Sequence, residues 1–156
     1  MRTLHLIAHD IRSRENVGSL FRTADSLGVK KIWLTGYTPA PPDARIAKVA
    51  LGAEGVVAFE KQQDVIGVID QLRADGYSVY ALELTPDAVD LVDFRPPEKI
   101  ALVLGTETTG VPPSLLERCD GAIKITQKGM KESMNVAVAA GIAAWGILRE
   151  IKANPR

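Results

Sequence analysis

Hydrophobic positions along the chain form short apolar runs, separated by stretches in which they recur every three or four residues. The short runs are typical of strands, and some, such as IALVL at 100–104, are apolar without interruption. An uninterrupted run indicates a strand covered on both faces, as in a parallel sheet. The pattern predicts strands at Leu4–Ala8, Lys31–Leu34, Val56–Phe59, Ser78–Leu84, Ile100–Leu104 and Ala122–Ile125.

The stretches between these runs have the period of helices. They predict helices at Asn16–Leu27, Asp64–Ala74, Ser114–Arg118 and about Ser133–Lys152. Strands that alternate with helices predict an α/β fold with a mainly parallel sheet flanked by helices. The proline-rich stretch Thr38–Ala44 is interpreted as a rigid loop rather than a linker, so residues 1–156 are expected to form one domain.

Composition narrows the class of protein. With 156 residues, 46% hydrophobic and 24% charged, the chain is an ordinary globular sequence and neither a disordered tail, a collagen-like fibre nor a disulfide scaffold. Its one cysteine, Cys119, is expected to be a small core residue. The start has too short an apolar run for a signal peptide, and Met134–Leu148 falls short of the roughly 20 residues that a bilayer needs. We therefore expect a cytoplasmic protein with no membrane or metal partner.

The charge balance hides a pattern. The formal net charge is zero, which by itself argues against a nucleic-acid partner. However, residues 1–50 hold 8 Lys or Arg against 4 Asp or Glu, residues 51–120 hold 5 against 13, and residues 121–156 hold 6 against 2. If the fold brings both ends together, one face is basic; otherwise the charges are scattered over a solvated surface. The candidates for RNA binding are Arg12, Arg14, Arg22, Lys128 and Lys131.

The first segment with candidate chemistry spans residues 16–25. Asn16 occupies an expected N-cap position, and Gly18 precedes Arg22 by one helical turn, where it is expected to leave space beneath the arginine stem. A guanidinium near the positive end of a helix can hold a phosphate by paired hydrogen bonds. The alternative is a capped amphipathic helix with a solvated arginine.

The second segment, residues 102–111, runs from an apolar strand into a loop with two glycines, Gly105 and Gly110. Ligands of parallel α/β sheets bind outside the carboxyl ends of the strands, where this loop is predicted to lie. Gly105 would let a ligand approach the backbone, and Glu107 would be the polar anchor. The alternative is a strand–helix turn in which the glutamate belongs to a helix cap.

The third segment, residues 125–136, is a polar loop that leads through Ser133 and Asn135 into the last helix. Ser133 is an N-cap candidate, which by itself would explain its presence. Gly141 and Gly146 inside this helix indicate close backbone packing, either in the core or between the helices of a dimer. The sequence has no glycine-rich phosphate-binding motif, and His5 and His9 are expected to be structural or solvated.

Taken together and in this order, the three segments resemble the SpoU/TrmH-type branch of the SPOUT RNA methyltransferases. The resemblance covers almost the whole chain and rests on Asn16…Arg22-Thr23-Ala24, Leu102-Val103-Leu104-Gly105-Thr106-Glu107…Gly110-Val111 and Ile125…Gly129…Ser133-Met134-Asn135-Val136. It implies a C-terminal trefoil knot, a homodimer, S-adenosylmethionine as methyl donor, and transfer to a ribose 2′-hydroxyl of tRNA or rRNA. The chain departs from the family in reading Thr126-Gln127 where Pro-Met is common, and Met134 where Leu is common.

The resemblance also implies roles for single residues. Arg22 would act on the RNA, in its own subunit or across the dimer. Asn16 and Ser133 would orient the reacting groups, and Glu107 and Asn135 would shape the site. The cofactor would lie among three loops that contain Leu82, Glu83, Leu104, Gly105, Ile125, Gln127, Ser133 and Met134. Two alternatives stay open: a non-enzymatic RNA-binding or assembly factor with the same fold, and a methyltransferase that modifies a base.

Overall fold

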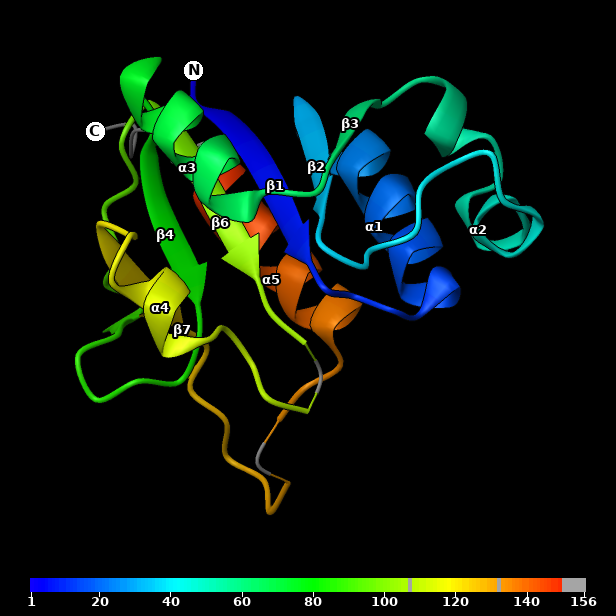
Figure 1. Ribbon diagram of the computed structural model, residues 1–156. Helices are drawn as coiled ribbons and strands as arrows, with labels where there is room; N and C mark the ends of the chain where they lie inside the picture. Colours follow the sequence, from blue (N-terminus) through cyan, green and yellow to red (C-terminus); the bar gives the residue numbers. More distant parts are fainter. Residues whose placement is uncertain (107, 132, 150–156) are drawn as a thin grey trace, which may run out of the picture.

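A seven-stranded sheet forms the centre of the protein, whose computed structural model describes residues 1–106, 108–131 and 133–149 (Figure 1). The strand order is β3-β2-β1-β6-β4-β7-β5, and every pairing between neighbours is parallel. The prediction of a mainly parallel α/β sheet is therefore confirmed. The strands are β1 (Thr3–His9), β2 (Lys31–Thr35), β3 (Ala58–Gln62), β4 (Ser78–Leu82), β5 (Val89–Asp90), β6 (Lys99–Leu104) and β7 (Gly121–Lys124).

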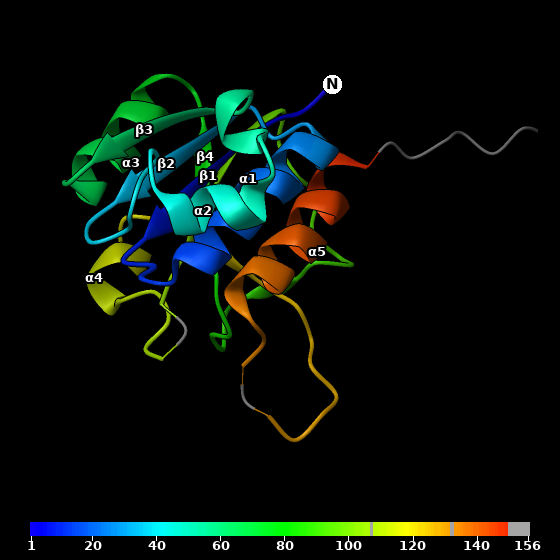
Figure 2. The ribbon, with the colours of Figure 1, turned by 90° about the vertical axis from the view of Figure 1, so that its right-hand side faces the viewer.

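Helices cover both faces of the sheet. On one face α1 (Arg14–Leu27) and α5 (Val136–Leu148) lie side by side, and α2 (Ala44–Ala50) packs on α1 (Figures 1 and 2). The other face carries α3 (Val65–Ala74) and α4 (Pro113–Leu116). Within the described residues, no helix is long and apolar enough to cross a bilayer.

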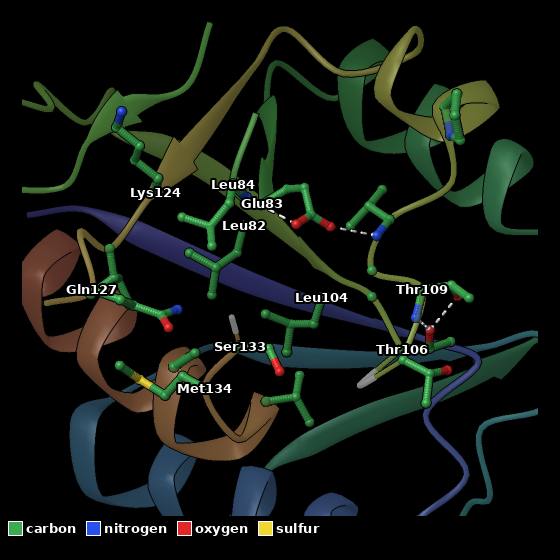
Figure 3. Close-up of a pocket in the computed structure, with 18 residues that line it drawn as sticks. Leu82, Glu83, Leu84, Leu104, Thr106, Thr109, Lys124, Gln127, Ser133 and Met134 are labelled. Carbon is green, nitrogen blue, oxygen red and sulfur yellow. Dashed lines mark hydrogen bonds between the residues drawn. The ribbon is translucent and has the colours of Figure 1, made fainter. Parts of the chain in front are cut away.

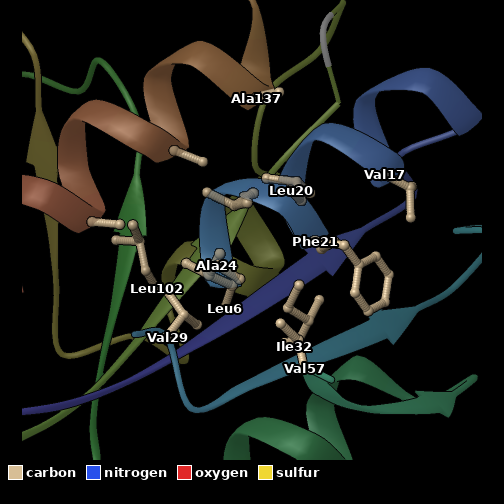
Figure 4. Packing of buried hydrophobic residues seen from close by; sticks show 14 of the residues in the cluster. Leu6, Val17, Leu20, Phe21, Ala24, Val29, Ile32, Val57, Leu102 and Ala137 are labelled. Carbon is tan, nitrogen blue, oxygen red and sulfur yellow. The ribbon is translucent and has the colours of Figure 1, made fainter. Parts of the chain in front are cut away.

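Two apolar cores result, one on each face of the sheet. Leu6 and Leu102 point into the larger core, where they pack with Phe21 and its neighbours from α1 (Figure 4). Ile7 and Val103, their neighbours along the same strands, point into the smaller core with α3. Because both faces are covered, successive strand residues are all apolar, which explains the uninterrupted runs in the sequence.

The structure contains three elements that the sequence did not predict: α2, the 3-10 turn η1 (Ala53–Gly55) and the two-residue strand β5. In addition, β3 begins two residues later than expected and β4 ends two residues earlier, at Leu82. These elements are short, so each offers too few periodic positions to stand out from a loop. For example, α2 buries only Ile46 and Ala50.

Both predicted N-caps in the candidate segments are wrong. Helix α1 is capped by Ser13, whose Oγ accepts a hydrogen bond of 3.1 Å from the backbone N–H of Asn16. Helix α5 is capped by Asn135, whose Oδ1 accepts from the N–H groups of Ala137 and Val138. Each of these polar side chains reaches the free N–H groups of the first turn directly, so Asn16 and Ser133 are not needed as caps.

Candidate functional site

A cavity of about 490 Å³ opens at the carboxyl ends of β4, β6 and β7 (Figure 3). Its walls come from the ends of these strands, the loops that follow them, and the start of α5. This is the edge where ligands bind in parallel α/β sheets, and the volume is in the usual range for a small-molecule site. The cavity is therefore the candidate site for a cofactor.

The structure brings together the residues predicted to hold the cofactor. The cavity is lined by Leu82, Glu83, Leu104, Gly105, Ile125, Gln127, Ser133 and Met134. Sequence reasoning missed further lining residues, among them Leu84, Thr106, Val111, Lys124, Val136 and Ala139. Their signal was only their place within or next to the three segments, because an apolar lining residue looks like a core residue in a sequence.

The Glu83 carboxylate fixes the wall between two of the loops. Its Oε2 accepts a hydrogen bond of 2.8 Å from the N–H of Val111, and its Oε1 accepts one of 2.9 Å from the N–H of Leu84. A Cβ at Gly110, whose φ is +68°, would lie 2.0 Å from Glu83 Oε2. The close approach of the carboxylate therefore requires glycine at position 110.

Gly105 lines the cavity, and the fold of its own loop gives a second reason for glycine at this position. A Cβ at this position would lie 2.3 Å from the carbonyl carbon of Gly110, so the packing of the loop leaves no room for a side chain. Thr106 and Gly110 exchange backbone hydrogen bonds, which closes the loop into a tight turn. Glu107, the predicted anchor, lies outside the described residues.

The loop between β7 and α5 is tied to β5 through a side chain. The Thr126 hydroxyl donates a hydrogen bond to Oδ2 of Asp90, and this bond lowers the pKa of Asp90. Thr126 stands where the resembled family often has proline, so a side-chain hydrogen bond holds a loop that proline would otherwise stiffen. Lys128 and Lys131 lie exposed on the same loop.

Residues of the first segment lie next to the cavity but do not line it. Asn135 Nδ2 donates a hydrogen bond of 3.2 Å to Asn16 Oδ1, which joins the start of α5 to α1. Arg22 is exposed on α1, and its guanidinium makes no hydrogen bond or ion pair with any residue that the structure describes. Asn16 and Asn135 are thus brought together, whereas Arg22 does not line the cavity of its own chain.

The predicted space beneath Arg22 does not exist. Gly18 is buried against α2, and a Cβ there would lie 2.7 Å from the Ile46 carbonyl oxygen and 2.8 Å from Val49 Cβ. The glycine allows α2 to pack closely on α1. This contact could not be foreseen, because α2 itself was not predicted.

The basic candidates Arg12 and Arg14, just before and at the start of α1, differ in their surroundings. Arg14 Nε donates a 2.7 Å hydrogen bond to Asp43 Oδ2, and this bond lowers the pKa of Asp43, the N-cap of α2. Arg12 is exposed, and its Cζ lies 5.5 Å from the centre of the Tyr37 ring. Arg14 therefore has a structural partner, and Arg12 is the freer of the two cations.

The histidines are placed as structural residues. His5 is buried, and His9 contacts Thr35 through Nδ1 at 3.1 Å and Asp10 through Nε2 at 3.3 Å. Burial lowers the pKa of both imidazoles. Among the described residues, no group of three or more His, Cys, Asp or Glu side chains is placed to hold a metal ion.

Comparisons with known proteins find similarity over most of the chain. The model of the SpoU rRNA Methylase family matches residues 3–145. A tRNA (guanosine(18)-2′-O)-methyltransferase of Borreliella burgdorferi is 29% identical over 152 residues, which are 96% of this chain and 67% of that protein. The mouse protein of the same description is 29% identical over 149 residues, 94% of this chain but 9% of that protein. The chain therefore spans only part of these relatives.

Solved structures share the fold. An AdoMet-bound rRNA methyltransferase from Sinorhizobium meliloti matches with a TM-score of 0.87 and 26% identity, over 93% of this chain and 55% of that one. A structure concerned with 2-OH methylation of C/U34 on tRNA matches with a TM-score of 0.82 and 26% identity, over 92% of this chain and 93% of that one.

Proposed function

The chain belongs to the SpoU rRNA methylase family, and on that premise we propose that it transfers a methyl group from S-adenosylmethionine to a ribose 2′-hydroxyl of tRNA or rRNA. The observation that carries the proposal is the cavity at β4, β6 and β7, where two of the three family segments meet. The Borreliella relative is described as a tRNA 2′-O-methyltransferase, and the Sinorhizobium structure binds AdoMet.

The residues of the cavity fit this cofactor. S-adenosylmethionine carries no phosphate, and the chain lacks a glycine-rich phosphate-binding motif. Leu82, Leu104 and Val111 offer an apolar surface for an adenine, and the backbone groups of the adjoining loops offer donors and acceptors for its edges. When bound, the cofactor supplies a methyl group on an electron-poor sulfonium.

In this proposal Arg22 holds the RNA phosphate beside the target ribose. A guanidinium keeps its proton in a protein, so Arg22 acts by positioning and by stabilising the negative charge that develops on the 2′-oxygen, not as a base. Asn16 and Asn135, already joined by a hydrogen bond, orient the segment that carries Arg22. Ser133 orients the acceptor at the rim of the cavity, and Glu107 completes the site. Holding the two reactants in line supplies much of the acceleration.

We further propose a homodimer that buries the outer face of α5. Val138, Ile142 and Trp145 lie on consecutive turns of this helix and are 53%, 39% and 59% exposed. An exposed apolar stripe of this kind marks a protein interface. Because Arg22 does not line its own cavity, the proposal assigns it to the cavity of the partner subunit.

The remaining features of the proposal concern topology and location. One domain with a C-terminal trefoil knot is supported by the path of the chain, which leaves β7 between β4 and β5 and returns across the sheet to α5 beside α1. A tRNA or rRNA substrate implies that the protein acts in the cytoplasm.

The test is methylation of RNA from cells that lack the gene, followed by digestion and mass spectrometry of the nucleosides. We expect a 2′-O-methylated nucleoside. A base-methylated product would contradict the ribose assignment, and failure to bind S-adenosylmethionine in calorimetry would instead indicate an assembly factor.

Arg22→Ala is expected to lower kcat/KM by about 100-fold or more, with the affinity for S-adenosylmethionine within about twofold of wild type. Arg22→Lys is the matched variant: it keeps the charge but not the bidentate geometry, so it should retain partial activity. Unchanged turnover of Arg22→Ala on the correct RNA would overturn the role of Arg22.

A further inference from the structure

Tyr37 presents an aromatic ring to solvent at the carboxyl end of β2. Its side chain is 69% exposed, although Gly36 before it and Thr38 after it are both buried. A single exposed aromatic residue is common on protein surfaces and needs no explanation by itself. What distinguishes Tyr37 is that the surrounding backbone is built to hold it in place.

Three side chains fix the backbone around the ring. The N–H of Tyr37 donates a 2.8 Å hydrogen bond to Asp10 Oδ1. Lys61 Nζ donates to the carbonyl oxygens of Gly36 and Thr38, at 2.5 and 2.6 Å. Burial lowers the pKa of this ammonium, which shows that it is partly withdrawn from water to make these bonds. The Thr38 hydroxyl in turn donates to the carbonyl oxygen of Ala8 at 2.7 Å.

The same loop uses unusual backbone conformations. Gly36 has a φ of +59°, and a Cβ there would lie 2.0 Å from Asp10 Oδ1. Asp10 itself has a φ of +55°, which costs a non-glycine residue about 1 kcal/mol or more. The loop is therefore rigid, and a ligand that stacks on Tyr37 does not have to order it first.

Arg12 places a positive charge over one face of the ring. Its Cζ lies 5.5 Å from the ring centre, and its side chain is exposed. Arg12 follows β1 and Tyr37 follows β2, which are parallel neighbours, so both lie at the edge where the cavity opens. The strand β1 also pairs with β6, whose end lines the cavity. Two strand spacings of about 4.8 Å put Tyr37 roughly 10 Å across the sheet from β6.

We propose that Tyr37 and Arg12 form a stacking site for an RNA base that flanks the methylated nucleotide. The base stacks on the face of the tyrosine ring that Arg12 does not cover, and the Arg12 guanidinium binds the adjoining phosphate or the edge of the stacked rings. The proposal rests on the proposed RNA substrate, because a flat exposed ring with an adjacent cation is the arrangement that single-stranded RNA recognises. It adds a contact that selects the unpaired sequence next to the target.

The test compares two fluorescein-labelled oligoribonucleotides of equal length, one of uridines and one of abasic residues, on the full chain. Both carry the same phosphates, so a residue that stacks on bases affects only the first. We expect Tyr37→Ala to weaken binding of the uridine oligonucleotide by about 5- to 100-fold, and binding of the abasic one by less than twofold.

Matched variants separate stacking from bulk and from charge. Tyr37→Phe keeps the ring and should bind as wild type, whereas Tyr37→Leu keeps apolar bulk and should resemble Tyr37→Ala. Arg12→Ala should weaken both oligonucleotides and reduce the salt dependence of binding by about one phosphate contact, a reduction that Tyr37→Ala should not produce. Circular dichroism and sedimentation of each variant report the fold and the oligomeric state.

The outcomes distinguish this inference from the proposed function. If Tyr37→Ala leaves discrimination between the two oligonucleotides unchanged while the wild type still methylates RNA, the stacking site is overturned and the proposed function stands. If Tyr37→Ala changes the oligomeric state, Tyr37 belongs to a protein interface and the stacking site is likewise overturned. If Tyr37→Ala no longer discriminates between the two oligonucleotides and the wild-type protein transfers no methyl group, the stacking site is supported and the proposed methyltransferase activity is refuted.

Discussion

Single polar side chains around the site act mainly by holding backbone in place. Glu83 joins two loops of the cavity, Asp10 holds the loop that carries Tyr37, and Asn135 caps α5 while contacting Asn16. Each accepts hydrogen bonds from backbone N–H groups through its side-chain oxygens, and Asn135 also donates one from Nδ2 to Asn16 Oδ1. A hydrogen bond of this kind contributes only modestly to the free energy of folding, whereas removing one partner leaves the other unsatisfied at a larger cost. These residues therefore hold the loops of the site in place.

His5 makes the stability of the whole chain depend on pH. It is 7% exposed, its Nδ1 accepts a 3.0 Å hydrogen bond from Trp33 Nε1, and its Nε2 has no partner among the described residues. Burial, together with Lys31, Lys30 and Lys99, lowers the pKa of His5 to about 4. The folded protein therefore keeps this imidazole neutral under conditions that protonate it in the unfolded chain.

We expect the free energy of unfolding to fall by about 2 kcal/mol between pH 7 and pH 4.5 because of His5. The sign follows because the unfolded chain, with a pKa near 6.5, binds a proton in this range that the folded chain binds only near pH 4. Urea unfolding at the two pH values measures the change. His5→Gln, which keeps an acceptor for Trp33, should show a smaller fall in the free energy of unfolding between the two pH values. The part of the fall that is due to His9 should remain. An equal loss in both proteins would contradict the assignment.

At the scale of elements, the contact between α1 and α2 depends on one missing side chain. Gly18 lets the two helices approach so closely that the Ile46 carbonyl oxygen would lie 2.7 Å from a Cβ. The nearest atoms are backbone and a Cβ, which cannot swing away as the end of a long side chain can. The same α1 also packs against α5, so its position sets both the segment that carries Arg22 and the start of α5.

Gly18→Ala should therefore lower the free energy of unfolding by about 1 to 2 kcal/mol, since the clash exceeds the gain in helix propensity. Gly141→Ala in α5 is the matched control, because the nearest atom to its Cβ would be Thr23 Cγ2 at an ordinary 3.5 Å. That variant should be neutral or up to about 1 kcal/mol more stable. Denaturant unfolding at one protein concentration measures both. Equal changes in the free energy of unfolding at the two glycines would show that helix propensity, and not the clash at Gly18, determines the effect.

At the scale of the whole molecule, the proposed dimer explains why the exposed Arg22 lies outside the cavity of its own chain. The same assembly would cover the apolar stripe on α5. Trp145→Glu, which places a charge on the most exposed residue of that stripe, should therefore convert the dimer to a monomer in sedimentation and abolish methyl transfer. A monomer with full activity would contradict both parts.

Mixed dimers provide the sharper test of Arg22 acting on the partner. Arg22→Ala removes the arginine, and Leu82→Trp fills the cavity while leaving Arg22 intact. When the two variants are co-expressed, half of the dimers are mixed and each has one complete site, so about a quarter of the wild-type activity should return. No return of activity, with mixed dimers present, would place Arg22 in its own subunit.

The sequence by itself determined the α/β class, the parallel sheet, and eight of the residues that line the cavity. These follow from apolar periodicity and from segments that are continuous along the chain, as Leu102–Val111 is. Tertiary structure alone decided the roles of Gly18 and Gly105, the caps Ser13 and Asn135, and the rigid presentation of Tyr37. Gly18 and Tyr37 depend on atoms from distant parts of the chain, namely α2 for Gly18, and Asp10 and Lys61 for Tyr37. Gly105 and the two caps depend on the exact path of the local backbone. A local pattern shows which residues are apolar or flexible, but only the packed chain shows what fills the space beside them.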